Sequence, residues 1–141
     1  LLNFFDINGR FVICDLPGYG YAKVPTAIRA KWGPMVETYL ADRPPLKGLL
    51  LLVDCRREPG DWERDLVGFA TAHGLQVALV ATKVDKLVKS KRVPKLAALA
   101  RRFGVPRHQV VAFSSLTGEG IEDLWRRMVR MLPADAGPGA G

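Results

Sequence analysis

The chain has 141 residues, enough for about one domain with a sizeable core. Its apolar share of 48% and charged share of 25% are typical of a globular protein and exclude wholesale disorder, collagen-like repeats and a coiled coil. The longest strongly apolar run, Gly48 to Val53, is far shorter than the roughly 20 residues of a membrane helix. No signal peptide is evident, so we expect a cytoplasmic protein with no membrane partner.

The N-terminal stretch Leu1 to Asp15 predicts a β-hairpin, because two apolar runs flank Asn8-Gly9. This dipeptide accepts the positive φ angles of a type I′ turn. An amphipathic helix is expected next, with a kink or a late start at Gly33-Pro34. Its apolar side carries Ile28, Trp32, Val36, Tyr39 and Leu40.

Three short apolar runs then predict strands that are covered on both faces, as in a parallel sheet. They are Leu49 to Asp54, Gln76 to Thr82 and Gln109 to Phe113. Helical patterns separate and follow them. This alternation predicts an α/β fold with a doubly wound, mostly parallel sheet and one antiparallel hairpin strand.

Three helices are expected among these strands. Asp61 caps the first, which runs to about His73 and stops at Gly74, with Leu66, Phe69 and Ala70 inward. Pro94 opens the second, with Leu96, Leu99, Ala100 and Phe103 inward before Gly104. The third has a core stripe of Ile121, Leu124, Trp125, Met128 and Leu132. We expect one domain over residues 1–132 and a flexible tail, rich in Pro, Gly and Ala, over 133–141.

The net charge of +7 is concentrated in one part of the chain. Between Lys86 and Gly118 there is no acidic residue, and the basic residues are Lys86, Lys89, Lys91, Arg92, Lys95, Arg101, Arg102 and Arg107. Charge alone leaves a solvated face and an RNA phosphate surface equally open. If the surface binds RNA, the candidate residues are Lys86, Lys89, Lys91, Arg92 and Lys95.

A first motif, Asp15-Leu16-Pro17-Gly18, follows the second hairpin strand and has the form DxxG. A carboxylate at Asp15 can hold Mg²⁺ through water, and Gly18 lets a backbone N–H approach a terminal phosphate. Taken alone, DxxG is a weak signal, and a simple turn at the end of a strand explains it better.

A second motif, Thr82-Lys83-Val84-Asp85, ends a buried strand. A fixed carboxylate at Asp85 can accept hydrogen bonds from the N1–H and the exocyclic amine of guanine, a donor pair that adenine lacks. Lys83 can lay its aliphatic stem along the base. In isolation, the two residues also fit an ordinary charged strand end.

A third motif, Phe113-Ser114-Ser115, ends the last strand. Backbone N–H groups in such a loop can donate to guanine O6, and the small serines permit close approach. The order and spacing of all three motifs turn three weak signals into a strong indication of nucleotide binding.

Longer strings around these motifs are more specific than the motifs. They are Leu2-Asn3-Phe4-Phe5, the run DLPGYGYAKV from Asp15 to Val24, Trp32, Tyr39-Leu40, Arg43, Asp54 with Arg56, Pro59, Asp61, the run TKVDKL from Thr82 to Leu87, and Phe113-Ser114-Ser115. Together they resemble the EngB (YihA/YsxC) family of bacterial GTPases, in the Ras-like P-loop superfamily, over nearly the whole chain. Thr82 in place of the more general Asn is that family's habit.

The resemblance implies a P-loop GTPase-like fold that binds GTP or GDP with Mg²⁺. It implies a role in assembly of the large ribosomal subunit, with links to cell division and septation, and we expect a monomer. Asp15 would hold Mg²⁺ through water, Gly18 would contact the γ-phosphate, and Lys83, Asp85 and Ser114 would bind guanine. The remaining GTP-binding candidates are Leu16, Pro17, Thr82, Val84, Phe113, Ser115 and Leu1, the last as the edge of the first switch.

Two departures from the superfamily pattern concern catalysis. The 141 residues contain neither the GxxxxGK[ST] phosphate loop nor the switch threonine, which the family places just before Leu1. We therefore expect an N-terminally truncated domain without its first strand, phosphate loop and first helix. That strand is central in the superfamily, so the chain alone should not bind GTP with useful affinity, nor hydrolyse it, and its fold should be weakened.

The second departure is Tyr19, which stands where many Ras-like enzymes have the Gln that orients water. The catalytic residue is therefore unknown. Water can be positioned from elsewhere in the protein, by a monovalent cation or by the ribosomal partner, and these stay open. The alternative to a GTPase switch is a non-enzymatic module that binds RNA or the ribosome with a GTPase-like fold.

Overall fold

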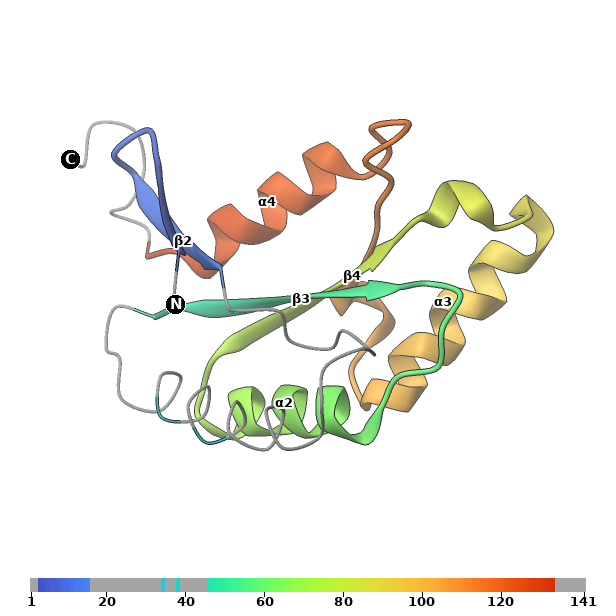
Figure 1. The fold of residues 1–141 in the computed structure, drawn as a ribbon, viewed down its shortest axis with the longest axis horizontal. Coiled ribbons are helices and arrows are strands. Elements are labelled where there is room, and N and C mark those ends of the chain that lie inside the picture. Colours follow the sequence, from blue (N-terminus) through green and yellow to red (C-terminus); the bar gives the residue numbers. More distant parts are fainter. Residues whose placement is uncertain (1–2, 16–33, 35–37, 39–45, 134–141) are drawn as a thin grey trace. The chain divides into compact units, whose positions relative to one another are not determined.

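Strands and helices follow one another in the order that the apolar patterns predict (Figure 1). The structure is a computed structural model, and it describes residues 3–15, 34, 38 and 46–133. The chain divides into two compact units, Lys47–Met131 and the remainder, and each is described by itself.

The predicted hairpin is confirmed. It consists of strands β1 (Asn3–Ile7) and β2 (Phe11–Asp15), which pair antiparallel. Asn8 and Gly9 have φ angles of 56° and 69°, as a type I′ turn requires, and the Arg10 N–H donates to the Ile7 carbonyl at 2.9 Å. Because Ile7 pairs with Phe11 rather than with Arg10, one extra residue lies between the paired ends.

The three later strands form a parallel sheet in the order β3-β4-β5. They are β3 (Gly48–Asp54), β4 (Gln76–Thr82) and β5 (Val110–Ala112). In β4 every residue from Val77 to Ala81 is buried, so the prediction of a strand covered on both faces is confirmed there. The last strand is shorter than expected, because Gln109 belongs to a short 3₁₀ helix, η2 (Arg107–Gln109).

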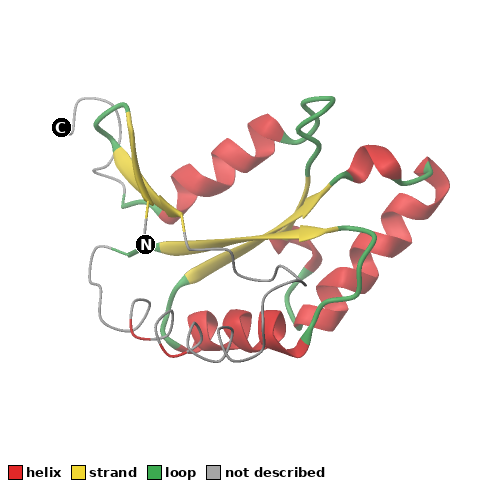
Figure 2. Ribbon diagram, viewed as in Figure 1, coloured by secondary structure: helices red, strands yellow, loops and turns green. Residues whose placement is uncertain are grey.

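Helices cover both faces of this sheet (Figure 2). They are α2 (Asp61–Ala72), α3 (Lys89–Phe103) and α4 (Ile121–Met131). In Figure 1, α2 and α3 lie on one face and α4 lies on the other. The doubly wound α/β arrangement is therefore confirmed, and the antiparallel hairpin forms a separate two-stranded sheet.

Two predicted helix starts are wrong. Gly60, not Asp61, is the residue that precedes α2, and no side chain caps this end. Helix α3 begins at Lys89, so Pro94 lies inside it. Pro94 lacks the N–H that would bond to the Ser90 carbonyl, yet one missing bond near the N-terminus does not stop a helix whose later turns bury an apolar face. The predicted stop at Gly104 is confirmed, with a φ of 68°.

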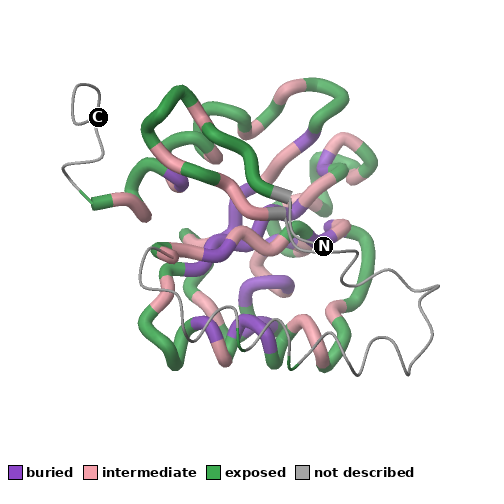
Figure 3. The backbone as a smooth tube through the Cα atoms, turned by 60° about the vertical axis from the view of Figure 1, so that its left-hand side comes forward, coloured by how far each residue is buried: buried purple, intermediate pink, exposed green. Residues whose placement is uncertain are grey.

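The apolar faces are confirmed for α3 and only in part for the other two helices. Leu66 and Ala70 of α2 are buried as expected, while Phe69 is half-exposed. In α4, Met128 is buried, but Ile121 and Trp125 are 43% and 44% exposed. A three-stranded sheet offers too narrow a surface to cover the whole apolar side of α4, so its stripe is only partly core. Figure 3 shows the buried segments gathered where strands and helices meet.

The remaining predictions lie mostly outside the described residues. Of the helix expected around Gly33-Pro34, only Pro34 and Thr38 are described; both are helical, and the Thr38 hydroxyl donates to the Pro34 carbonyl at 2.9 Å. The tail beyond Pro133 is likewise outside. Within the described ranges, no helix has the length and apolar character needed to cross a membrane.

Candidate nucleotide-binding site

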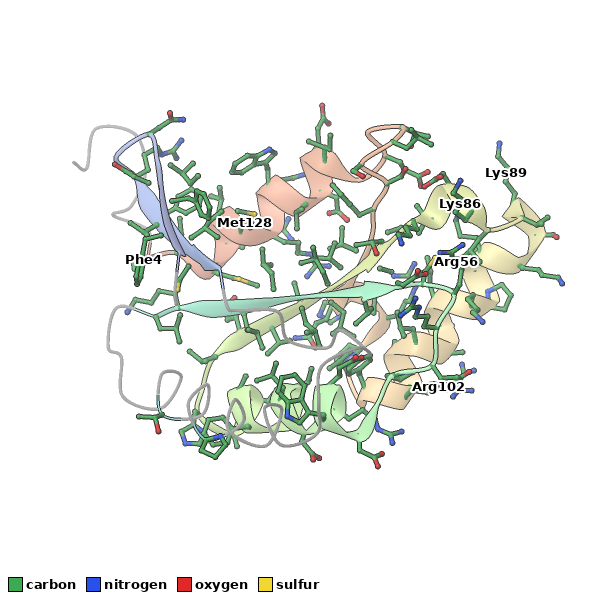
Figure 4. The ribbon with its side chains drawn as sticks, in the orientation of Figure 1. Phe4, Arg56, Lys86, Lys89, Arg102 and Met128 are labelled. Carbon is green, nitrogen blue, oxygen red and sulfur yellow. The ribbon has the colours of Figure 1, made fainter. Side chains whose placement is uncertain are left out.

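The carboxyl ends of β3, β4 and β5 bring three polar loops to one edge of the sheet. This edge is where open α/β sheets bind ligands. The loops follow Asp54, Thr82 and Ala112, so the structure brings together Thr82, Lys83, Val84, Asp85, Phe113, Ser114 and Ser115, all predicted from the sequence. Figure 4 shows Arg56 and Lys86 at this edge.

The turn at Lys83 has an uncommon backbone conformation. Its φ of 62° lies in the left-handed region, which non-glycine residues rarely adopt. Hydrogen bonds hold it there: the Lys83 carbonyl accepts from the Lys86 N–H at 2.9 Å and from Cys55 Sγ at 3.5 Å, while the Val84 N–H donates to the Phe113 carbonyl at 3.2 Å. Backbone strain that the surroundings enforce in this way is common at functional sites.

A direct side-chain contact joins the second and third motifs. The Ser114 hydroxyl donates to Oδ1 of Asp85 at 2.8 Å, and the same oxygen of Ser114 accepts the Thr117 N–H at 3.1 Å. Ser114 is fully buried. The orientation of the Asp85 carboxylate is therefore fixed by a buried hydroxyl, and no hydrogen bond between described residues uses its Oδ2, which can accept from a ligand.

Thr82 and Phe113 join the strand ends. The Thr82 hydroxyl donates to the Val53 carbonyl at 3.1 Å, and the Phe113 N–H donates to the Ala81 carbonyl at 2.9 Å. Both contacts lie within the sheet edge. They fix where the loops begin, so these two residues contribute to ligand binding by positioning the loops.

Residues 113–120, between β5 and α4, form a loop that we call the serine loop, and within it Ser114 and Ser115 differ in what they can offer a ligand. The Ser114 N–H donates to the Glu119 carbonyl at 2.9 Å, so it is already used. Ser115 is exposed, and its N–H has no acceptor among the described residues. The backbone donor that this loop can present to a base is therefore that of Ser115.

A cluster of charges at the end of β3 lies next to Lys83. Arg56 donates to both carboxylate oxygens of Asp54, from Nε at 3.1 Å and from Nη2 at 2.9 Å, and Lys83 Nζ is 3.5 Å from Asp54 Oδ2. The hydrogen bond from Arg56 holds the pKa of Asp54 well below its usual range, and the same bond raises the pKa of Arg56. Burial raises the pKa of the Cys55 thiol, with a further contribution from the Asp54 charge.

The basic residues of the RNA-binding candidate set are not equivalent. Lys86, Lys89 and Lys91 are exposed, and Lys95 is half-buried. Arg92 is also half-buried, and it donates to Glu119 Oε2 at 2.6 Å and to the Val84 carbonyl at 3.1 Å. Three lysines are thus available to a partner, whereas Arg92 is engaged inside the protein.

The residues of the first motif are not placed relative to this site. Asp15 is the last residue of β2, in the other unit, and its side chain is not described. Leu1, Leu16, Pro17, Gly18 and Tyr19 lie outside the described residues. Their roles at the phosphates and the metal stay predictions.

Sequence reasoning missed Glu119 and named Arg92 only as an RNA-binding candidate. Arg92 is one of many basic residues in its segment, and Glu119 lies in a glycine-rich turn. Their ion pair joins residues 27 positions apart, which no helical or strand period predicts. Asp54 and Arg56 stand out only through the family resemblance; their spacing after a strand gives them no role by itself.

Known proteins with similar sequences are named "Probable GTP-binding protein EngB". That of Desulforapulum autotrophicum is 47% identical over 132 residues, which are 94% of this chain and 68% of the relative. That of Geotalea daltonii is 43% identical over 141 residues, which are 100% of this chain and 68% of the relative. The chain belongs to the EngB family. It spans about two thirds of the length of these relatives, and no family model matches it.

Solved structures agree with an EngB fold. A crystal structure of a probable GTP-binding protein engB matches with a TM-score of 0.79 over 92% of this chain and 78% of that chain, at 18% identity. Era in complex with MgGDPNP and a segment of 16S ribosomal RNA matches with a TM-score of 0.66 over 94% of this chain and 44% of that chain, at 17% identity. At such low identity, these matches bear on the fold alone.

Proposed function

We propose that this chain carries the guanine-reading part of an EngB-type GTP-binding switch protein. The observation that supports this most is the Asp85 carboxylate, fixed by Ser114 at 2.8 Å at the ligand-binding edge of the sheet. Asp85 would accept hydrogen bonds from the N1–H and the 2-amine of guanine, and the Ser115 N–H would donate one to O6. The side chain of Lys83 would cover one face of the base. The EngB name of the relatives supports the same ligand.

In the complete protein, GTP and GDP would bind alternately and GTP hydrolysis would switch the conformation. Asp15 would hold Mg²⁺ through water and Gly18 would contact the γ-phosphate. Within the described ranges, no group of three or more His, Cys, Asp or Glu side chains could hold a metal. Neither the hydrolytic residue nor the source of the positioned water is assigned.

Base discrimination tests this proposal. The protein, expressed from its complete reading frame, is titrated with GDP and ADP by calorimetry. We expect a preference for GDP that can reach the order of 10⁴, because ADP leaves the buried polar groups of the base site unpaired. Equal affinity for the two nucleotides would refute guanine recognition and favour a non-enzymatic module.

We further propose that RNA of the large ribosomal subunit contacts exposed lysines in and just after residues 83–88, the guanine-reading loop between β4 and α3, in a cytoplasmic, monomeric protein. Lys86, Lys89 and Lys91 carry positive charge into solvent beside the nucleotide site, where a partner can respond to the bound nucleotide. Era, whose fold is similar, is solved in complex with a segment of 16S ribosomal RNA, and RNA is the class of partner that we propose for this chain.

Charge reversal tests this interaction. Lys89→Glu with Lys91→Glu should weaken RNA binding and lower the slope of log K against log salt by about 0.7 to 0.9 for each phosphate that is no longer neutralised. Arg92 stays unchanged, because its guanidinium is engaged within the protein. Arg126→Glu with Arg130→Glu, on α4, makes the same change in net charge and serves as control. Equal weakening in both double variants would show that only overall charge matters.

A further inference from the structure

The guanidinium group of Arg92 lies between the two loops that form the base site. It projects from the first turn of α3 and is 23% exposed. Nη2 donates to the carbonyl of Val84 at 3.1 Å, and Nη1 donates to Oε2 of Glu119 at 2.6 Å. Val84 belongs to the guanine-reading loop and Glu119 to the serine loop. One side chain of α3 therefore holds both loops at once.

The two loops are also joined on the side of the base, so the contacts form a closed ring. Ser114 donates its hydroxyl to Asp85 and its N–H to the Glu119 carbonyl at 2.9 Å. The Glu119 carboxylate accepts a hydrogen bond from Arg92, and Arg92 also donates to the carbonyl of Val84, the neighbour of Asp85. A shift of Glu119 would be passed through Ser114 to the carboxylate that reads the base.

These contacts contribute more to position than to stability. The Glu119 side chain is 42% exposed, and ion pairs at such exposure stabilise a fold little. The Val84 carbonyl also accepts the Leu87 N–H at 3.1 Å, so removal of Arg92 does not leave it without a donor. Loss of Arg92 would therefore loosen the loops without unfolding the unit.

We propose that Arg92 is a positioning residue for guanine recognition, acting through Val84 and Glu119 to hold Asp85 against the base. This proposal rests on the proposed function. It also separates Arg92 from the neighbouring lysines: they face a partner, whereas Arg92 serves the nucleotide site.

The test compares Arg92→Ala with Arg102→Ala in the protein expressed from its complete reading frame. Arg102 lies on the same helix and pairs with Glu58, away from both loops, so its substitution makes the same change in charge. Affinities for GDP and IDP are measured by calorimetry, since IDP lacks the 2-amine that Asp85 would bind. We expect Arg92→Ala to lower GDP affinity about tenfold and to reduce the ratio of GDP to IDP affinity, with no change in Arg102→Ala.

Two more variants make the test independent of folding. Glu119→Gln removes the charge partner and should lower the GDP to IDP ratio in the same direction, and Arg92→Lys should restore part of it. A fall in GDP affinity with an unchanged ratio, or equal effects in Arg92→Ala and Arg102→Ala, would overturn the positioning role. A wild-type protein that does not prefer GDP to ADP contradicts the proposed function itself, and the role of Arg92 with it.

Discussion

The carboxylate of Asp54 is held by two cations at the end of β3. Arg56 binds both of its oxygens, Lys83 Nζ lies 3.5 Å from Oδ2, and the Asp54 side chain is only 11% exposed. The pKa of this carboxyl is well below its usual range, mainly because of the Arg56 hydrogen bond. Asp54 therefore stays ionised at every physiological pH and keeps Lys83 at the entrance of the site.

Asp54→Asn should lower the free energy of unfolding at pH 7 by about 1 to 2 kcal/mol, because a neutral amide cannot form the charge-assisted hydrogen bonds with Arg56. The folded-state pKa is depressed, so the stabilisation is complete above the unfolded value of about 3.9 and disappears as the pH falls through the lower folded value. Urea denaturation from pH 7 to pH 3 measures it. The difference in unfolding free energy between wild type and Asp54→Asn should be constant down to about pH 5 and shrink below about pH 4.

The control for this pH series is Asp65→Asn, on the exposed side of α2. It should leave stability near wild type at each pH. The difference in unfolding free energy between wild type and Asp54→Asn must not disappear between pH 7 and pH 5, and it must be smaller at pH 3. Either failure would contradict a depressed pKa for Asp54.

Single residues of the site were predictable where a motif fixed their neighbours. Lys83 and Asp85 follow a buried strand, and the structure places both at its end. Ser114 was predicted to contact guanine directly, but its hydroxyl and N–H are both engaged within the protein. The pairing of Arg92 with Glu119 was not predictable, because it depends on how α3 lies beside a loop from another part of the chain.

At the scale of elements, two glycines with positive φ differ in their surroundings. At one, a side chain would meet only backbone strain, and at the other it would also clash with a neighbouring strand. Gly104 ends α3 with a φ of 68° and open space where a Cβ would lie. Gly120 precedes α4 with a φ of 86°, and a Cβ there would overlap the carbonyl oxygen of Ala112, at the end of β5. This close approach allows the serine loop to return directly to the start of α4.

Gly104→Ala should lower the free energy of unfolding by about 1 to 2 kcal/mol, the strain of a left-handed alanine. Gly120→Ala should cost a further 1 to 3 kcal/mol or so, because the overlap adds to the same strain. Thermal and urea unfolding of the two variants measure the difference. Equal destabilisation in both would show that the approach to Ala112 is not constrained.

The elements themselves followed well from apolar periodicity, and the starts of two helices did not. The three parallel strands, the hairpin turn and the Gly104 stop are confirmed, because they depend on local residues. Tertiary packing decides where α2 and α3 start and how far Ile121 and Trp125 are buried. A pattern along the chain does not contain this information.

At the scale of the whole molecule, the chain carries the proposed base site but no segment with the phosphate-loop pattern. No GxxxxGK[ST] occurs in its 141 residues. In the described part of Lys47–Met131, β3 pairs with β4 on one side only. The family relatives are about half as long again, since the chain spans about two thirds of them.

We therefore expect the 141-residue polypeptide, expressed alone, to bind GTP more weakly than micromolar strength, because it lacks the motif whose backbone and lysine bind the phosphates. Calorimetric titration of the purified polypeptide checks this, with the product of the complete reading frame as reference. Micromolar binding by the 141 residues alone would contradict the expectation and show that another segment holds the phosphates.

The central claim is that Asp85 reads guanine, and Asp85→Asn tests it most directly. The amide reverses one direction of hydrogen bonding, so the preferred nucleotide should change from GDP to XDP, which carries an oxygen where guanine has its 2-amine. Asp65→Asn, the same substitution at an exposed position of α2, should leave the preference for GDP intact. The account predicts a reversed ratio of GDP to XDP affinity in Asp85→Asn, and an unchanged preference for GDP would contradict it.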